Sequence, residues 1–456
     1  MAGIGFELRK LLKRENLLGL LQAYSYAGVI SSGPWVLSII GILLIGLMSY
    51  AVVVPDFLIV QFQVTVTYII ALSLILTGAF QLAFTRFSAD RLFERRNEVI
   101  LPNFHAVTLV VTVVSGLLGM TAAVFLFPQQ SVLYRMMSVA AFVIMSNIWI
   151  ATIFLSGMKQ YKAIVWLYFA GYAVTVLAAL ALRRWNLEGL MIGFVLGHTV
   201  LLLGMMTLIL RNFSSDRFMS FEFFDRTQMF PALLWIGLFY NLGVWVDKFM
   251  FWYVPSTSQA VIGPLRASLI YDLPVFLAYL SIIPGMAIFL VRLETDFVEY
   301  YDAFYNAVRS GGSLESIEEF RNGMVETVKL GIYEIVKIQT IVVLLLIVTG
   351  RALLEWLGIS TLYLSLLYVD TVAAGLQVVF LGILNVFFYL DKRRIVLALT
   401  ALFVVLNLAF TAVTLELGPA FYGYGFAGAL LVVVMAGAYR LSRTLGRLEY
   451  ETFMLQ

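Results

Sequence analysis

The chain has 456 residues, of which 62% are hydrophobic and 12% are charged, and its formal net charge at pH 7 is +3. Soluble domains contain roughly 45 to 50% apolar residues, so this composition excludes an ordinary water-soluble globule. Cysteine is absent, which excludes disulfides and cysteine-ligated metals. The small net charge and the scattered basic residues disfavour a nucleic-acid partner.

Residues 1–18 form a leader with an amphipathic pattern. Ile4, Leu8, Leu11 and Leu12 fall on one helical face, and Arg9, Lys10, Lys13 and Arg14 on the other. We expect this leader to lie on the cytoplasmic surface of the bilayer. The apolar stretch after it is too long for a cleavable signal peptide.

Apolar stretches of bilayer length follow along the rest of the chain. A hydrocarbon core near 30 Å thick requires about 20 apolar residues in a helix, and only helices and closed barrels satisfy their backbone groups in lipid. We expect an all-α membrane protein of about 12 transmembrane helices, because barrel strands alternate over about ten residues. The expected spans are residues 19–48, 62–84, 104–127, 132–155, 163–182, 189–210, 230–254, 269–291, 333–354, 363–390, 395–415 and 421–439.

Counting divides these spans into two six-helix lobes, as in transporters built from two repeats. The first lobe is residues 19–210 and the second is residues 230–456. The polar stretch 211–229 between them is the expected cytoplasmic linker.

Basic residues indicate which loops are cytoplasmic, since these loops are enriched in Lys and Arg. The opposite side receives few of them: Arg135, Arg183, Arg184, Arg266 and Arg351. The cytoplasmic side receives Arg9, Lys10, Lys13, Arg14, Arg86, Arg91, Arg95, Arg96, Lys159, Lys162, Arg211, Arg217, Arg226, Arg292, Arg309, Arg321, Lys329, Lys392, Arg393, Arg394, Arg440, Arg443 and Arg447. Both termini are therefore expected in the cytoplasm.

The second lobe contains a long polar segment, residues 292–332. Ser316 and Glu319 have the spacing of a capping box, and an amphipathic helix is expected after them. Its apolar face is Ile317, Phe320, Met324 and Val328. Such a helix either lies on the membrane surface or docks to a cytoplasmic partner.

Ionisable residues inside the spans are the first candidates for function, since each costs about 2.5 to 3.5 kcal/mol to insert at a helix centre. Asp247 and Lys248 lie deep in the seventh span, and being adjacent they point about 100° apart on a helix. At least one of them must find a partner elsewhere. They either line a polar pathway or form a structural ion pair between helices.

Further candidates lie in the eighth and tenth spans. Asp272 follows Arg266 by six residues, and Pro274 and Pro284 are expected to interrupt the helix after it. Such an interruption marks either a pathway-lining helix or a packing kink. Asp370 in the tenth span is the last acidic candidate, unless it lies at the hydrated interface.

Small residues mark two other spans. Ser31, Ser32, Gly33 and Pro34 predict a break in the first span, which points to a transport site but is also common in inert membrane helices. Gly193 and Gly197 have the GxxxG spacing that favours close helix packing.

Aromatic rings near these spans are candidate stacking surfaces for sugars, although most such rings face lipid or pack against other helices. They are Tyr24, Tyr26, Trp35, Tyr240, Trp245, Tyr271 and Tyr279.

No HExxH, GxSxG or Walker-type motif occurs, and His105 and His198 are far apart in the sequence. An enzyme, a metal site and a cofactor are therefore not expected. A membrane-embedded glycosyltransferase in particular would need a larger extramembrane segment than 292–332.

Three sequence blocks carry a resemblance to a known family: MAGIGFELRKLL with LLGLLQAYSYAGVISSGPW, then GPLRASLIYDLPVFLAYLSIIPGMAIFLVRLETDF, and NVFFYLDKRR. Over its whole length the chain resembles the Pel exopolysaccharide transport subunit family (PelG). That family belongs to the polysaccharide transporter branch of the multidrug, oligosaccharidyl-lipid and polysaccharide exporter (MOP) superfamily, with twelve helices in two lobes.

The resemblance implies a bacterial inner-membrane protein that moves an N-acetylhexosamine-rich biofilm polysaccharide from cytoplasm to periplasm. Its implied partners are a cytosolic glycosyltransferase and membrane subunits of the Pel apparatus, one of them a cyclic-di-GMP receptor. In related exporters acidic residues bind coupling ions, and no defined signature aligns Asp247, Asp272 or Asp370 with them.

The sequence thus favours a polymer transporter with a hydrated cavity between two lobes, lined by Asp247, Lys248 and Asp272. Two alternatives stay open. One is a flippase for lipid-linked oligosaccharides, and the other is a non-transporting scaffold for a polysaccharide synthase.

Overall fold

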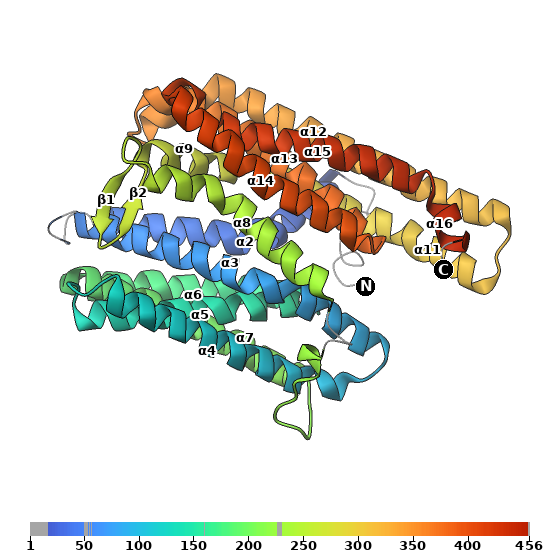
Figure 1. Ribbon diagram of the computed structural model, residues 1–456, viewed down its shortest axis with the longest axis horizontal. Coiled ribbons are helices and arrows are strands. Elements are labelled where there is room, and N and C mark those ends of the chain that lie inside the picture. The colour runs from blue at the N-terminus through green and yellow to red at the C-terminus, as the bar shows by residue number, and fades with distance from the viewer. Residues whose placement is uncertain are drawn as a thin grey trace. The chain divides into compact units, whose positions relative to one another are not determined.

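The computed structural model describes residues 17–49, 53, 55, 57–158, 160–225 and 230–454, and these residues are nearly all helical (Figure 1). Most of the expected leader, residues 1–16, lies outside the described residues, as do residues 226–229 of the expected linker.

The helices of the first half are α2 (Leu17–Ser49), α3 (Phe57–Phe93), α4 (Ile100–Phe125), α5 (Val132–Gly157), α6 (Tyr161–Leu182), α7 (Asn186–Asn212) and α8 (Pro231–Tyr253). A two-stranded hairpin follows, formed by β1 (Gln259–Ile262) and β2 (Leu265–Ala267). The remaining helices are α9 (Leu269–Leu280), α10 (Ile283–Val291), α11 (Val298–Ser310), α12 (Leu314–Trp356), α13 (Leu364–Tyr389), α14 (Arg393–Leu417), α15 (Tyr424–Leu445) and α16 (Leu448–Met454).

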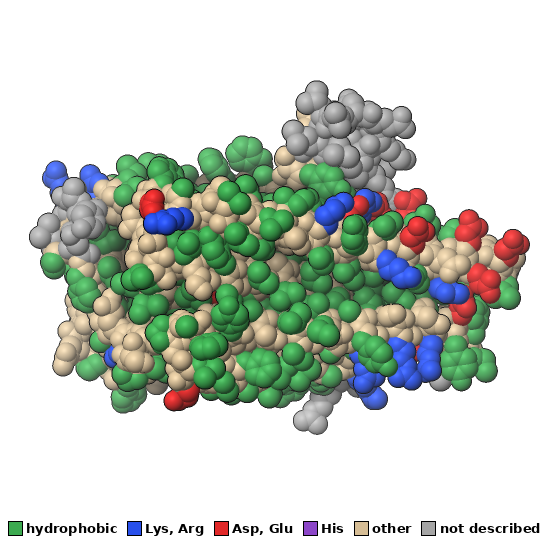
Figure 2. Space-filling view, turned by 90° about the horizontal axis from the view of Figure 1, so that it is seen from above, with side chains coloured by type: hydrophobic (Ala, Val, Ile, Leu, Met, Phe, Trp, Pro, Cys, Tyr) green, Lys and Arg blue, Asp and Glu red, His purple; other side chains and the backbone are tan. Residues whose placement is uncertain are grey.

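The helices identify a multi-pass membrane protein. In the described part of the chain, eight helical stretches are long and apolar enough to cross a membrane, or nine if the pair after β2, bent by 40°, counts as one span. Figure 2 shows hydrophobic side chains over the middle of one face, with charged side chains mostly toward its two ends. Large exposed side chains of α12 and α15, such as Leu344, Val348 and Met435, fit contact with lipid rather than water.

Two compact units make up the chain. Unit 1 consists of Met1–Ser32, Val246–Met250 and Leu269–Gln456, and unit 2 consists of Gly33–Trp245 and Phe251–Ser268. Both α2 and α8 therefore contribute residues to both units, and the division of α2 falls between Ser32 and Gly33.

In unit 2, α6 and α7 pack with their backbones in close approach. A Cβ atom on Gly193 would overlap the backbone of Ala179, and one on Gly197 would overlap the backbone of Thr175. The expectation of close helix packing at this GxxxG spacing is confirmed, and the partner is α6 of the same chain.

The β-hairpin in unit 2 follows α8 directly. Its strands are antiparallel, with Gln259 opposite Ala267 and Ala260 opposite Arg266. Gly263 at the turn has a φ of +53°, a conformation that a residue without Cβ adopts most easily. Gln61 of α3 donates a hydrogen bond to the Val261 carbonyl, which ties the hairpin to a helix of the same unit.

In unit 1, α13 packs against α9, α12 and α15, and α14 packs against α15 (Figure 1). Rings from three helices meet in this bundle: Phe403 lies 5.6 Å from Phe380 and 6.2 Å from Phe426 between ring centroids. Helices α9 and α13, which carry the candidates Asp272 and Asp370, thus belong to one packed bundle.

The polar segment 292–332 forms a π-helical turn, α11 and the first half of α12. Ile317, Met324 and Val328 are buried, which confirms the expected apolar face. The expected cap at Ser316 is wrong, because α12 begins earlier and Ser313 accepts the hydrogen bond from the Ser316 amide. Gly311, in the left-handed conformation, ends α11 and leaves Ser313 at the start of the next helix.

Helix α12 has 43 residues and is about 65 Å long at 1.5 Å per residue, about twice the thickness of a hydrocarbon core. Its first half is therefore free to extend beyond the membrane. An ion pair of 2.9 Å between Arg321 and Glu449 joins it to α16.

The α6–α7 contact generates a stability prediction. Gly197→Ala is expected to cost about 1 to 3 kcal/mol, because its Cβ would meet backbone that cannot move aside. The measurement is the melting temperature of the purified protein in detergent. Gly116→Ala in α4 is the control, since its nearest neighbour would lie 3.9 Å away. Equal melting temperatures for the two variants would contradict the packing.

Candidate functional site: a buried charged cluster in unit 1

Helix α8 carries two charged residues in an otherwise apolar turn. Asp247 is 0% exposed and Lys248 is 5% exposed, and both belong to unit 1. An unpaired charge here would be very costly, so the partners of each group decide what the site can do.

The two side chains pair with each other. Lys248 Nζ lies 3.0 Å from Asp247 Oδ2 and 3.3 Å from Oδ1. Adjacent residues on a helix point in different directions, but the flexible lysine chain folds back to its neighbour.

Asp247 also accepts hydrogen bonds from two other helices. Tyr271 of α9 donates its hydroxyl to Oδ2 at 2.7 Å, and Asn407 of α14 donates its amide to Oδ1 at 3.1 Å. Thr411, one turn further along α14, donates to Asn407 Oδ1 at 3.0 Å and orients that amide. The Asp247 carboxylate is therefore held by side chains of two other helices, α9 and α14, and by the lysine of its own helix.

Aromatic rings surround the ammonium group. Lys248 Nζ lies 4.5 Å from the centre of the Phe426 ring and 5.3 Å from that of Tyr279. Ring faces attract cations, more strongly where water is excluded. Tyr279 in turn donates its hydroxyl to Gln377 of α13 at 3.0 Å.

Asp370 of α13 differs from Asp247 in its partners. It is 2% exposed, and neither carboxylate oxygen has a hydrogen-bond partner among the described residues. Lys248 and Asp247 are the charged groups that act on it electrostatically. A Cβ on Gly423, at the start of α15, would lie 2.9 Å from its Oδ1, so only glycine leaves room there. Asp370 is thus a buried carboxyl group that can take up a positive charge.

The structure therefore brings together five of the residues that the sequence singled out: Asp247, Lys248, Asp370, Tyr271 and Tyr279. Asn407, Thr411 and Gln377 are additions that the sequence analysis missed. A buried amide in an apolar span, followed four residues later by a threonine, was the available signal.

Asp272 and Arg266 have other surroundings. Asp272 is half-buried in the first turn of α9. Arg266 lies on β2 in unit 2, where its Nε and Nη2 donate to the hydroxyl and carbonyl of Ser258 at 2.9 and 3.0 Å. These hydrogen bonds hold the Arg266 side chain against the residues just before β1, so the hairpin determines where it lies.

The two prolines that were expected to interrupt the eighth span have different positions in the helices. Pro274 lies inside α9, while the chain bends at Ser281 and Ile282, just before Pro284 in the first turn of α10. Proline is favoured there because a first-turn amide has no helical partner.

In α2 the helix continues through residues 31–34, and the buried Ser32 hydroxyl donates to the Gly28 carbonyl at 2.5 Å. The side chains of Ser31, Gly33, Pro34 and Trp35 lie outside the described residues. Among the aromatic candidates, Tyr24 and Tyr26 are half-buried in unit 1, and Tyr240 and Trp245 are half-buried in unit 2.

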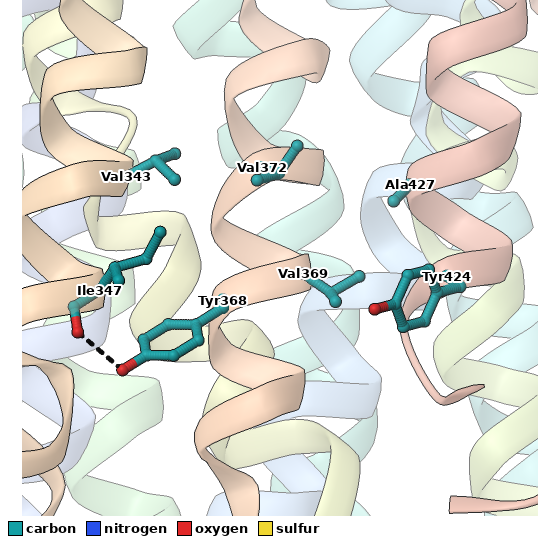
Figure 3. A pocket seen from close by; sticks show the side chains of 7 residues that line it. All are labelled: Val343, Ile347, Tyr368, Val369, Val372, Tyr424 and Ala427. Atoms are coloured by element: carbon teal, nitrogen blue, oxygen red, sulfur yellow. Dashed lines mark hydrogen bonds between the residues drawn. The ribbon is translucent and has the colours of Figure 1, made fainter. Parts of the chain in front are cut away.

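A groove of about 290 Å³ lies between α12, α13 and α15 of unit 1 (Figure 3). Its lining is apolar except for two tyrosines, and Tyr368 donates its hydroxyl to the Ile347 carbonyl at 2.9 Å. The other lining residues are Val343, Val369, Val372, Tyr424 and Ala427. None of the charged residues of the cluster lines it, so it is no candidate for the charged site.

Solved structures with this fold are membrane transporters. An outward-facing multidrug resistance MATE family transporter of the MOP superfamily matches with a TM-score of 0.66 at 15% identity, covering 93% of this chain and 96% of that chain. A MOP superfamily transporter from Pyrococcus furiosus matches with a TM-score of 0.65 at 14% identity, covering 93% and 96%. A MATE protein in complex with Br-NRF matches with a TM-score of 0.64 at 15% identity, covering 98% and 99%.

The chain thus has the fold of MATE-type transporters of the MOP superfamily. No curated protein matches it. The PelG family, described as putative exopolysaccharide exporters (EPS-E), matches residues 1–453, and the chain belongs to this family.

The ion pair generates a second stability prediction. Lys248→Met is expected to destabilise the protein by about 3 to 5 kcal/mol, because it leaves the Asp247 carboxylate buried without its cation. Adding Asp247→Asn in the same chain should restore part of this loss, since it removes the uncompensated charge. Thermal unfolding in detergent measures both.

The matched control for this prediction is Arg351→Met. Its ion pair with Glu355 is exposed, at 74% and 56% for the two side chains, so its removal should leave the melting temperature unchanged. A double variant less stable than Lys248→Met alone would contradict the pairing.

Proposed function

We propose that this chain exports a Pel-type, N-acetylhexosamine-rich exopolysaccharide from the cytoplasm to the periplasm and so supports secretion of a biofilm matrix. It would do so as a protein of the bacterial inner membrane with twelve spans in two six-helix lobes and both termini in the cytoplasm. Membership of the PelG family and the MATE-type fold support a transporter of exopolysaccharide. The bias of basic residues supports the orientation.

The observation that carries the proposal is the buried cluster of Asp247, Lys248 and Asp370. Burying three ionisable groups in apolar helices costs free energy and does not help the helices insert into lipid. In membrane proteins such groups mark ion and substrate pathways. Two of the three are paired, while both oxygens of Asp370 lack a hydrogen-bond partner among the described residues.

The proposed mechanism is a competition for Lys248. With Asp370 ionised, the cluster carries a net charge of −1, and the ammonium is attracted by both carboxylates. When Asp370 takes up a proton or a monovalent cation, the cluster becomes neutral and Asp247 is the carboxylate that attracts Lys248, whose Nζ lies 3.0 Å from Asp247 Oδ2. Because Asp247 is held by α9 and α14, the occupancy of Asp370 on α13 would bias how these helices pack.

The polymer itself would move through a hydrated cavity, with Asp272 and Arg266 proposed to contribute to its lining. Ser31–Pro34 and Pro274, which lie within continuous helices, and Pro284, which follows the bend between α9 and α10, are proposed to contribute to its lining or movement. The rings proposed to stack on sugars are Tyr24, Tyr26, Trp35, Tyr240, Trp245 and Tyr271.

The proposed partners are a cytosolic glycosyltransferase and membrane subunits that include a cyclic-di-GMP receptor. The polar segment 292–332 is their proposed contact.

Asp370→Asn tests the proposal. It keeps the size of the side chain but can no longer exchange a proton, so secretion of polysaccharide should fall by at least about tenfold, a change of about 1.4 kcal/mol in the rate-limiting step. The measurement is polymer in the medium, normalised to the amount of the protein in the membrane. Asp302→Asn on the exposed face of α11 is the control and should secrete normally.

Normal secretion by Asp370→Asn at normal protein levels would contradict the role of Asp370. The same assay with Asp247→Ala and Asp272→Ala tests the pathway, and unchanged export in both would remove them from the mechanism. Transport by the purified chain in liposomes without partners would support a transporter over a scaffold, and a requirement for a lipid-linked substrate would support a flippase.

A further inference from the structure

Unit 2 buries an ionisable residue that the proposed export mechanism does not use. His198 of α7 is 1% exposed. Along the described helices of unit 2, Asp, Glu, Lys and Arg occur only near the helix ends. Apart from tyrosines, His198 is thus the buried ionisable side chain that lies away from the ends of the described helices of this unit, whereas the buried Arg91 lies near the end of α3 and His105 near the start of α4.

The hydrogen bonds of His198 define its tautomer. Its Nδ1 lies 2.8 Å from the Phe194 carbonyl, which can only accept, so Nδ1 carries a proton. Thr175 lies 3.5 Å from the same nitrogen, and its hydroxyl already donates to the Gly171 carbonyl. In neutral histidine, Nε2 is then the acceptor, and it lies 3.3 Å from the hydroxyl of Tyr172 on α6.

Tyr172 connects the imidazole to α2. Its hydroxyl also hydrogen bonds the side chain of Ser38. Its ring packs directly on α2, because a Cβ on Gly41 would lie 2.9 Å from its Cδ1. Ser38 and Gly41 belong to the part of α2 that lies in unit 2.

The three side chains have two complete hydrogen-bond arrangements. With neutral His198, Ser38 donates to Tyr172 and Tyr172 donates to Nε2. With protonated His198, Nε2–H donates to Tyr172 and Tyr172 donates to Ser38. Each arrangement satisfies both imidazole nitrogens and the Tyr172 hydroxyl, so the imidazole can gain a proton without leaving either of these buried side chains unpaired.

We propose that His198 is a proton-binding site of unit 2, and that its protonation reverses the hydrogen bonds through Tyr172 to Ser38 and so changes how α2 is held. The proton comes from the aqueous phase and returns to it, and no bond other than N–H is made or broken. The proposed ligand of this site is the proton, so the proposal does not depend on which polysaccharide the chain exports.

The groups that face the imidazole are few. They are Tyr172 and Thr175 from α6, the Phe194 ring stacked 3.9 Å away within α7 and, beyond Tyr172, Ser38 from α2 and the stacked ring of Tyr168. The other helices that pack on α7 are α3 and α5, and their charged residues lie near the helix ends: Arg86, Asp90, Arg91 and Arg135. The charge of a protonated His198 would therefore be felt chiefly by this hydrogen-bonded chain.

Nitrogen NMR of the full chain in lipid bilayers tests proton binding directly. The chain has only two histidines, so ¹⁵N-histidine labelling gives two imidazoles, and His105→Gln assigns them. We expect the Nε2 resonance of His198 to shift by one protonation step as the pH is lowered from about 8 to about 3, while Nδ1 stays protonated. An imidazole that remains neutral over this range would overturn the proposal.

A spin label on α2 tests the coupling. The chain has no cysteine, so Ile40→Cys, at a position 45% exposed, accepts one label. Its EPR spectrum should change over the pH range of the His198 titration, and His198→Gln should abolish that change. Tyr172→Phe should abolish it too while the NMR titration persists.

His105→Gln is the matched control and should leave the EPR response intact. A response that survives both His198→Gln and Tyr172→Phe would contradict the proposed route from the imidazole to α2. Neither experiment requires the transported polymer, so failure here is distinguishable from failure of the proposed export function.

Discussion

The absence of water from the hydrocarbon core is the constraint on which this molecule depends. Each buried polar group must find its partner within the chain, because none is available in lipid. Asp247 shows how far this goes, since its carboxylate binds a lysine on its own helix, a tyrosine on α9 and an amide on α14. The same hydrogen bonds that offset the cost of burying the charge also link α8, α9 and α14.

Asp370 and His198 share one property under this constraint: each is a buried ionisable side chain that has room for, or can accept, a positive charge. Asp370 is buried with neither oxygen hydrogen bonded to a described residue, and His198 is buried in a chain of hydrogen bonds that is complete in either direction. One group leaves room for a positive charge, and the other can accept a proton without loss of pairing. We therefore propose in each unit a position where occupancy by a small cation would change the hydrogen bonding between helices, which is the kind of two-state element that transport requires.

Much of the helical layout could be predicted from the sequence. Apolar stretches of bilayer length are a strong signal, and the expected spans fall mostly on helical residues, although the span expected over 269–291 is divided between α9 and α10. The Gly193 and Gly197 pair correctly indicated close packing, and burial confirmed Ile317, Met324 and Val328 as one face. The cap of α12 was placed wrongly, because Ser313 and Ser316 both have suitable side chains and only the end of α11 at Gly311 decides between them.

The candidate site was harder to predict, because its partners come from helices far apart in the chain. The charges of Asp247, Lys248 and Asp370 singled them out, but nothing local links Asp247 to Asn407, which lies 160 residues later. The direct contact of Asp247 with Lys248 depends on how a flexible side chain folds back, which helix geometry does not determine. Asn407 escaped attention because neutral amides are not costly enough in apolar spans to stand out.

The central claim is that the cluster in unit 1 meets water during transport although it is buried in lipid-inserted helices. Thr411→Cys beside Asn407 tests this in the naturally cysteine-free chain, with Leu431→Cys on the exposed face of α15 as reference. A thiol reacts with a charged maleimide only where water lets it ionise. The account predicts that Cys at 411 reacts at least about tenfold faster than Cys at 431 in secreting cells, and equal, slow labelling at both positions would contradict it.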